Sequence, residues 1–196
     1  MNGMDMSLLK HRLKQCGFRP VQFSYPTVSC SLKDNAKKLQ YFIQQLEKTS
    51  NVDTVHFVAH SMGGLLVRQF FYDYPEQCPG RVVTLGTPHQ GSQIAKRMGR
   101  NPFGKILLGE SYIHGLRGDV PPWMNKRDMA VFAGTTSIGI GRLVYPISRP
   151  NDGTVAVSET YLDDIKLHRV FTSTHMGLLF SGEVAHAVCR FLHKGV

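Results

Sequence analysis

The sequence predicts an α/β fold, with a mostly parallel sheet covered by helices on both faces. Short runs of β-forming residues alternate along the chain with longer runs whose apolar residues recur at helical spacing. Strands that alternate with helices in this way form parallel sheets. The chain has 196 residues and no segment with the composition of a linker, so we expect a single domain over 1–196.

The first quarter of the chain predicts two helices around one strand. Leucines form a stripe over 6–16, and Gly17 follows as a natural helix end. Residues 21–25 have the pattern of a strand, and Ser31 can cap a helix over 32–49. Four apolar residues form the inner face of that second helix. They are Leu39, Phe42, Ile43 and Leu46.

The strongest pattern lies in residues 54–70. Uncharged β-formers over 54–59 predict a buried strand, and a helix with apolar spacing follows the turn at 60–64. Small residues let the two backbones approach closely at this turn. The turn lifts Ser61 clear of the sheet, at a helix N-terminus that favours developing negative charge. A serine nucleophile needs such a position.

The rest of the chain predicts three more strands, over 81–86, 128–133 and 167–172, and a last helix over 184–192. Residues 93–128 are irregular, and their apolar side chains form either a lid or pocket wall, or part of the core. Those side chains are Phe103, Ile106, Leu107, Leu108, Ile113, Leu116 and Trp123. The glycine-rich residues 134–141 lack the Gly-Lys-Ser/Thr of a phosphate loop, and we expect them to be mobile.

Three segments resemble those of a known family. Ala-His-Ser-Met-Gly, beginning at Ala59, is similar to the Gly-x-Ser-x-Gly elbow of the α/β-hydrolase superfamily. Asn-Asp-Gly around Asp152 and His-Met-Gly-Leu-Leu-Phe-Ser from His175 resemble the acid and histidine segments of its small bacterial lipases and esterases. The resemblance implies a carboxylic ester hydrolase that forms an acyl-enzyme through the triad Ser61, His175 and Asp152, without a cofactor.

The resemblance gives each triad residue a role. His175 takes the proton of Ser61 and returns it to the leaving alkoxide, while Asp152 holds the imidazole in the required tautomer. The alternatives are an inert serine in an ordinary turn, a helix-capping histidine and an Asn-Asp-Gly turn without catalytic function. Asp163 and Asp164 are the second choice for the acid.

The oxyanion hole of the family needs two N–H donors, of which the amide of Met62 is one. The other comes from a loop that follows an earlier strand and begins with His-Gly, and no strand followed by His-Gly precedes Ser61 in the sequence. We expect an N-terminally shortened domain; the amides of Asn2 and Gly3, or weak activity, are the alternatives. Losing one donor typically costs about 100- to 1,000-fold in rate.

The substrate is expected to be a small-molecule or lipid ester with an acyl chain, bound near His60, Leu65, His89 and Leu178. The alternative is that the leucines complete the core and that His60 packs or hydrogen-bonds locally. The remaining histidines considered are expected to be structural. They are His11, His168, His186 and His193.

Two readings from other classes compete with the hydrolase. A hydrolase-fold binding module with little or no activity fits the missing oxyanion donor, and a thioesterase or acyltransferase uses the same triad. The net charge of +9 suggests nucleic-acid binding as a third hypothesis. However, the basic residues are scattered, and no basic run is interleaved with aromatics. We therefore expect no nucleic-acid partner and only transient contact with a lipid interface. The sequence does not predict an oligomeric state.

Composition also bears on metals and location. No metal-binding motif occurs, so no metal is expected. The cysteines at 16, 30, 78 and 189 form no Cys-x-x-Cys pair, and reduced thiols slightly favour the cytosol. With no signal peptide or transmembrane segment seen, the expected location is cytoplasmic.

Overall fold

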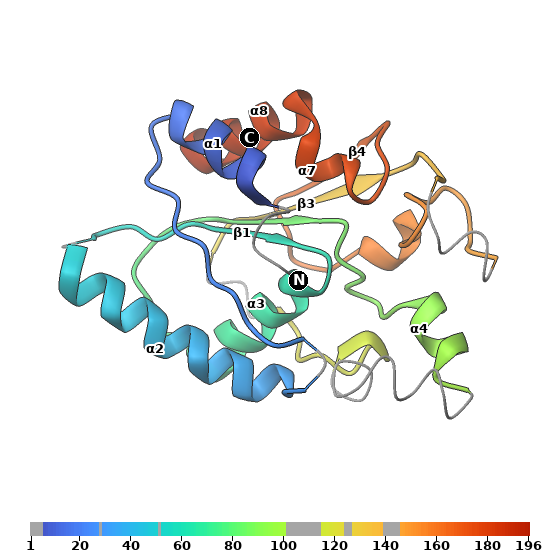
Figure 1. Ribbon diagram of the computed structural model, residues 1–196, viewed down its shortest axis with the longest axis horizontal. Helices are drawn as coiled ribbons and strands as arrows, with labels where there is room; N and C mark the ends of the chain where they lie inside the picture. Colours follow the sequence, from blue (N-terminus) through green and yellow to red (C-terminus); the bar gives the residue numbers. More distant parts are fainter. Residues whose placement is uncertain (1–5, 28, 51, 101–114, 124–126, 139–145) are drawn as a thin grey trace.

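A parallel four-stranded sheet forms the centre of the molecule (Figure 1). The computed structural model describes residues 6–27, 29–50, 52–100, 115–123, 127–138 and 146–196. The strands stand side by side in chain order, with β1 paired to β2, β2 to β3 and β3 to β4, all parallel. Their bounds are β1 (Phe57–His60), β2 (Val82–Leu85), β3 (Met129–Gly134) and β4 (Leu167–Phe171). The predicted mostly parallel sheet is confirmed.

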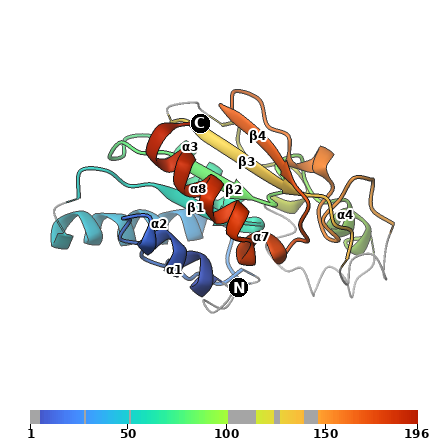
Figure 2. The same ribbon diagram turned by 90° about the horizontal axis from the view of Figure 1, so that it is seen from above.

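Helices cover both faces of the sheet (Figures 1 and 2). One face carries α1 (Ser7–Gln15), α7 (Gly177–Phe180) and α8 (Gly182–Lys194). The other carries α2 (Leu32–Ser50) and α3 (Met62–Asp73). The short helix α4 (Gln93–Met98) lies beyond the end of the sheet, at the right of Figure 1, and the 3₁₀ helix η3 (Val157–Thr160) follows the acid segment.

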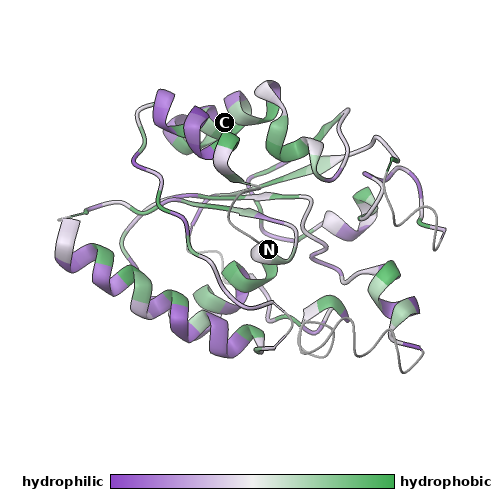
Figure 3. Ribbon diagram, viewed as in Figure 1, coloured by the Kyte–Doolittle hydropathy of each residue, from purple (hydrophilic) through white to green (hydrophobic). Residues whose placement is uncertain are grey.

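The side chains of β3 divide the core into two layers. All six residues of β3 are buried. Met129 and Val131 pack toward α2 and α3, while Ala130 and Phe132 pack toward α1 and α8. This is the alternation that a strand buried on both faces produces. In Figure 3 the helices carry both hydrophilic and hydrophobic residues, as expected of elements with one buried side.

Residues 21–25 do not form the predicted strand. They belong to no strand and no pairing that the structure describes. Instead Phe23 and Tyr25 stack on each other, with ring centroids 5.8 Å apart, and Phe23 packs on Phe42 of α2 at 5.3 Å. A strand is defined by backbone hydrogen bonds to a neighbour, so a β-rich sequence without such a neighbour stays irregular.

Most other predicted elements are confirmed to within three residues. Ser31 caps α2, because its hydroxyl accepts a hydrogen bond from the backbone N–H of Asp34 at 3.1 Å. Leu39 and Ile43 of the predicted inner face are buried. The last helix, α8, runs from Gly182 to Lys194 and so extends beyond the predicted range at both ends.

The predicted lid or pocket wall is only partly visible, because 101–114 and 124–126 lie outside the described residues. In the described part, α4 occupies the start of the segment. Val120 and Trp123 are buried in the layer of α2 and α3. This end of the segment therefore completes the core. Of the glycine-rich residues 134–141, the structure describes those up to residue 138. The mobility expected of this segment stays a prediction.

A disulfide between Cys16 and Cys189 joins the end of α1 to α8. The two helices lie side by side on one face of the sheet, which brings together cysteines 173 positions apart in sequence. The expectation of reduced thiols is therefore wrong for this pair, since sequence spacing carries no sign of the helix contact. Cys30 and Cys78 are free thiols. Among the described helices, none has the length and apolar character needed to cross a membrane.

Candidate active site

Ser61 occupies the sharp turn that connects β1 to α3. Its backbone angles are φ 54° and ψ −127°, a positive φ that non-glycine residues rarely adopt. Its N–H donates to the carbonyl of Leu85 at 2.8 Å, and its own carbonyl accepts from the Thr87 hydroxyl at 2.7 Å. These two bonds tie the strained turn to the end of β2, and the Ser61 side chain is not buried.

The two glycines that follow Ser61 meet different surroundings. A Cβ atom on Gly64 would lie 2.2 Å from the Oγ1 atom of Thr87, so only glycine fits there. A Cβ atom on Gly63 would have its nearest neighbours at 3.6 Å, which is ordinary contact. The Thr87 side chain therefore requires a glycine at one of the two positions, a difference that the sequence pattern does not reveal.

Asp152 and His175 form a hydrogen-bonded pair. The His175 Nδ1 atom lies 2.7 Å from Oδ2 of Asp152, and the carboxylate is 1% exposed. The other carboxylate oxygen accepts the N–H groups of Thr154 at 2.9 Å and Val155 at 2.7 Å. The His175 N–H in turn donates to the Asp152 carbonyl at 2.9 Å. A side-chain hydrogen bond and a backbone hydrogen bond thus hold the His175 imidazole against the Asp152 carboxylate.

The imidazole of His175 lies over the end of β2, beside the turn of Ser61. A Cβ atom on Gly86 would be 3.0 Å from Nδ1 and 3.1 Å from Cε1 of this ring. Gly86 directly follows Leu85, whose carbonyl binds the N–H of Ser61. The described contacts include no hydrogen bond from the Ser61 hydroxyl to His175, and such bonds often tighten only when substrate is bound.

His60 and His89 are both enclosed by the fold. The Nε2 atom of His60 lies 3.0 Å from the carbonyl oxygen of His175, and the two rings are 4.6 Å apart. His89 shares a hydrogen bond with the Thr84 hydroxyl at 3.0 Å. Burial lowers the pKa of each imidazole to about 3, helped by His175 for His60 and by Arg68 for His89. Both are uncharged at neutral pH, and their contact with a substrate stays a prediction.

The two leucines predicted to bind substrate are completely buried. Leu178 lies near the histidine, because its Cδ1 atom is 3.1 Å from where a Cβ on Gly86 would stand. Leu65 contacts the irregular segment in the same way, with its Cδ1 atom 3.6 Å from a Cβ on Gly115. Both leucines thus contribute to the core, and their contact with a substrate stays a prediction.

The second-choice acids and the oxyanion donors are less well defined. Asp163 and Asp164 are exposed on the surface, and no described hydrogen bond links either of them to His175. Met62 is the first residue of α3, so its N–H has no acceptor within the helix. Asn2 and Gly3 lie outside the described residues. No described group of three or more histidine, cysteine, aspartate or glutamate side chains can hold a metal ion.

Glu159 is a structural residue of this region that the sequence analysis did not find. It is 4% exposed, and its two oxygens accept the N–H groups of Gln93, at the start of α4, and of Ala156, in the acid segment at 2.6 Å. Burial raises the pKa of this carboxyl, against the effect of the two hydrogen bonds. Nothing in the local sequence marks Glu159, because both of its partners are backbone groups.

Arg68 is a second residue missed by the sequence analysis. It is buried on α3 and donates to the carbonyls of His89 at 2.8 Å and Pro121 at 2.7 Å. Burial lowers its pKa to about 10. Arg68 thereby joins two loops to the helix that follows the elbow. The sequence did contain a sign of this role. Arg68 is a charged residue on the apolar face of its helix, three positions from both Leu65 and Phe71.

Comparison with known proteins agrees with this architecture. A family model described as alpha/beta hydrolase fold matches residues 18–105. No curated protein sequence matches the chain. Among solved structures, the mature lipase BlEst2 of Bacillus licheniformis is 21% identical, with a TM-score of 0.66 over 82% of this chain and 73% of that one.

Two further structures are similar at lower identity. The metagenomic carboxyl esterase MGS0156 is 17% identical, with a TM-score of 0.67 over 85% of this chain and 63% of that one. Phospholipase PlaB of Legionella pneumophila is 16% identical, with a TM-score of 0.68 over 97% of this chain and 56% of that one. The chain thus spans less than two thirds of either protein. With its parallel sheet and its strand–turn–helix at Ser61, the chain is an α/β-hydrolase-fold protein.

Proposed function

We propose that the protein hydrolyses carboxylic esters through a covalent acyl-enzyme, with Ser61 as nucleophile, His175 as general base and acid, and Asp152 as the acid of the triad. The observation that carries the proposal is the buried Asp152–His175 pair at 2.7 Å. This pair lies next to a serine whose positive φ and position between strand and helix suit a nucleophile.

The reaction begins with the imidazole. Because the Asp152 carboxylate accepts a hydrogen bond from Nδ1–H of His175, Nε2 is left free to take the proton of the Ser61 hydroxyl. The serine oxygen attacks the ester carbon, and the N–H of Met62 stabilises the resulting oxyanion. His175 then gives its proton to the leaving alkoxide, and a water molecule repeats the sequence to release the acid.

The proposed substrate is a neutral ester with an acyl chain, supplied as a small molecule or from a lipid surface. This class is supported by the solved structures of similar fold, which are a lipase, a carboxyl esterase and a phospholipase. Neither a cofactor nor a nucleic-acid partner is part of the proposal. The cytoplasmic location stays a prediction, and the Cys16–Cys189 disulfide favours an oxidising compartment instead.

A weakly active or inactive binding module is the second candidate. It is favoured by one observation, namely that the part of the chain described here offers Met62 as the only oxyanion donor that we can assign. Thioester hydrolysis and acyl transfer use the same triad as ester hydrolysis, so they differ from the main proposal only in the substrate and the acceptor.

Labelling with a fluorophosphonate tests the proposal, because the probe reacts only with an activated serine. We expect stoichiometric labelling of the wild type at Ser61, together with hydrolysis of a short-chain nitrophenyl ester. Ser61→Ala should lose both while its circular dichroism spectrum stays native. Ser158→Ala, a change at an exposed serine, is the matched control and should keep both. A folded wild type that is neither labelled nor active contradicts the enzyme and supports the binding module.

A further inference from the structure

His60 and His175 meet although their strands lie at opposite edges of the four-stranded sheet. His60 is the last residue of β1, and His175 follows β4, with β2 and β3 between these strands. The Nε2 atom of His60 nevertheless lies 3.0 Å from the carbonyl oxygen of His175. The loop after β4 folds back as far as Gly86, at the end of β2, and the His60 side chain meets it there.

The direction of this hydrogen bond fixes the tautomer of His60. A carbonyl oxygen only accepts, so the Nε2 atom of His60 carries the proton. The Nδ1 atom then has no proton, and it is buried without a hydrogen-bond partner. A buried polar atom without a partner costs free energy, which an apolar side chain at this position would avoid. This cost indicates that the position requires the Nε2–H donor.

His60 is also uncharged at neutral pH. Burial and then the proximity of His175 lower the pKa of His60 to about 3. In the proposed reaction the His175 ring becomes a cation, and the centre of the His60 ring is 4.6 Å from it. A charged ring at that distance would repel the cation, whereas a neutral ring does not. His60 can therefore support the base without disfavouring its protonated form.

Three hydrogen bonds hold His175, and they come from two directions. The Asp152 carboxylate lies 2.7 Å from Nδ1, and the Asp152 carbonyl accepts the backbone N–H at 2.9 Å. The third bond, from His60 to the His175 carbonyl, comes from the residue directly before Ser61. The first two bonds tie the base to the acid segment, and the third ties it to the elbow. The third bond therefore restrains the separation between the imidazole and the hydroxyl whose proton it takes.

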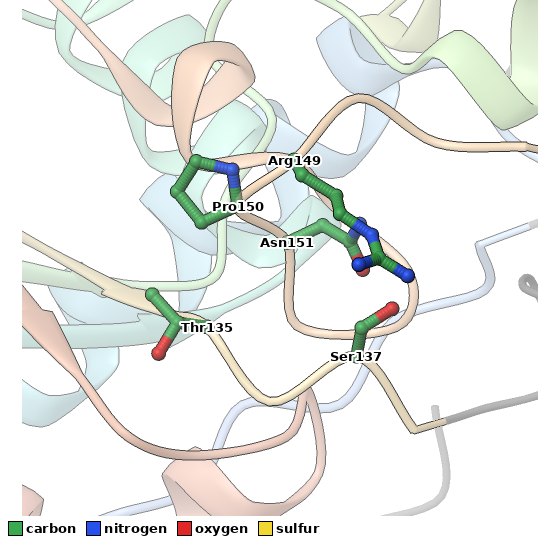
Figure 4. Close-up of a pocket in the computed structure, with 5 residues that line it drawn as sticks. All are labelled: Thr135, Ser137, Arg149, Pro150 and Asn151. Atoms are coloured by element: carbon green, nitrogen blue, oxygen red, sulfur yellow. The ribbon is translucent and has the colours of Figure 1, made fainter.

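The pocket beside the acid segment supports that segment from another side. It has a volume of about 540 Å³ and is lined by Thr135, Ser137, Arg149, Pro150 and Asn151 (Figure 4). The Asn151 amide donates to the Ser148 carbonyl at 3.1 Å, and the Thr135 hydroxyl donates to the Phe171 carbonyl at 3.2 Å. These two bonds hold the acid segment and the end of β3, and neither of them reaches His175. The restraint toward the elbow comes instead from the end of β1.

We propose that His60 is a positioning residue of the proposed triad. Its Nε2–H holds the backbone of His175 and so sets the distance between the His175 imidazole and the Ser61 hydroxyl. This role rests on the ester hydrolysis proposed above, and it replaces the expected contact of His60 with substrate. A contact with substrate acts on KM, whereas support of the base acts on the step in which the Ser61 proton is transferred.

Steady-state hydrolysis of a nitrophenyl ester by two variants of similar size separates these roles. His60→Met removes the donor, so kcat should fall about 10- to 100-fold while KM changes less than about twofold. His60→Gln keeps an N–H donor at similar reach and should keep kcat within about threefold of the wild type. Fluorophosphonate labelling of Ser61 should slow together with kcat, because it needs the same proton transfer. His186→Met, at an exposed position on α8, is the control and should change neither.

The proton NMR signal of the Asp152–His175 hydrogen bond gives a readout that does not depend on turnover. A proton in a short, buried bond to a carboxylate resonates far downfield and exchanges slowly with water. In His60→Met this signal should broaden or vanish, because the ring is no longer held from the elbow. In His60→Gln it should remain as in the wild type. His60→Phe, which keeps a ring without a donor, replaces His60→Met if that variant does not fold.

These measurements distinguish failure of the positioning role from failure of the hydrolase. An active wild type whose donor-free variant keeps its kcat, or raises KM alone, overturns the role of His60 and leaves ester hydrolysis standing. Equal losses in the donor-free variant and in His60→Gln also overturn it, since the donor would then not matter. A proton signal that is the same in both variants does so whether or not the wild type is active. An inactive wild type whose signal still depends on the donor contradicts the hydrolase and supports the positioning of His175 by His60.

Discussion

The turn of Ser61 and the segment of Asp152 reach the same edge of the sheet by different means. The turn is held by close packing, with the backbone of Gly64 pressed against the side chain of Thr87. The acid segment is held by carboxylates, since Asp152 and Glu159 together accept three backbone N–H groups within residues 154–156 and one from Gln93. One half of the proposed site is fixed by shape and the other by charge.

This difference sets the way in which each half fails. A region held by close contact is sensitive to added volume and indifferent to proton concentration, because no ionisable group carries its contacts. A region held by buried carboxylates tolerates little change of charge, since each N–H that loses its acceptor remains unsatisfied in the interior. The following substitutions separate the two kinds of failure.

Removing the charge of the acid should have the largest effect. Asp152→Asn keeps the size of the side chain but favours the wrong tautomer of His175, so kcat should fall about 10⁴-fold. The measurement is the steady-state hydrolysis of a nitrophenyl ester. Asp164→Asn, on the exposed surface, is the control and should change kcat less than twofold. If Asp164→Asn causes the large loss instead, the acid has been assigned to the wrong residue.

Adding one carbon atom at the elbow should come next. Gly64→Ala forces a Cβ atom to within 2.2 Å of the Thr87 hydroxyl, so we expect a loss of about 2–3 kcal/mol in the free energy of unfolding. Gly63→Ala meets its nearest neighbours only at 3.6 Å and should change the free energy of unfolding by less than about 1 kcal/mol, because alanine also favours the helix. Urea unfolding followed by circular dichroism measures both. Equal losses in the two variants would disprove the shape argument.

Neutralising the buried support of the acid segment should have a smaller effect. In Glu159→Gln, one of the two backbone N–H groups bound by Glu159 faces an amide NH₂ group. We expect a loss of about 1–3 kcal/mol in the free energy of unfolding. Because the Asp152 segment loosens, kcat should fall more than KM rises. Glu183→Gln, at an exposed ion pair with Arg169, should cost less than about 1 kcal/mol. A Glu159→Gln variant with unchanged stability and unchanged kcat would remove this residue from the site.

The mildest test uses proton concentration alone. The pKa of His89 is about 3 in the folded protein and 6.5 in the unfolded chain, so below pH 6.5 the unfolded chain binds the extra proton. The stability that the protein gains by burying a neutral His89 is therefore complete above pH 6.5. The free energy of unfolding falls as the pH drops from 6.5 toward 3. Between pH 7 and pH 5 this loss is about 2 kcal/mol for one histidine.

The variant His89→Gln should make the unfolding free energy less dependent on pH over that interval, as measured by urea unfolding at both pH values. His11→Gln, at an exposed position on α1, is the control and should keep the slope of the wild type. An unchanged slope in His89→Gln would show that another group accounts for the loss of stability in acid.

The sequence predicted the features that short-range patterns determine. The elbow at Ser61 and the α2 cap at Ser31 depend on residues within a few positions, and both appear as expected. The structure also brings Asp152 and His175 together, as the resemblance implied, although their catalytic roles remain to be tested. In each case the signal lies within one segment of the chain.

The sequence could not predict the features that depend on distant contacts. Residues 21–25 have strand-forming side chains, yet no described strand pairs with them. Glu159 binds the backbone N–H of the distant Gln93, which leaves no trace in residue type, and the single charge of Arg68 on an apolar helix face does not tell which loops it binds. The buried positions of Leu65 and His89 follow from packing between elements, which a list of residues does not contain.

The bond between Cys16 and Cys189 makes one large covalent ring out of most of the polypeptide. A protease that cuts the backbone once anywhere inside this ring cannot release a fragment, since both pieces stay attached through sulfur. On a denaturing gel the nicked protein would migrate as a single species until a reductant is added, when it would split in two.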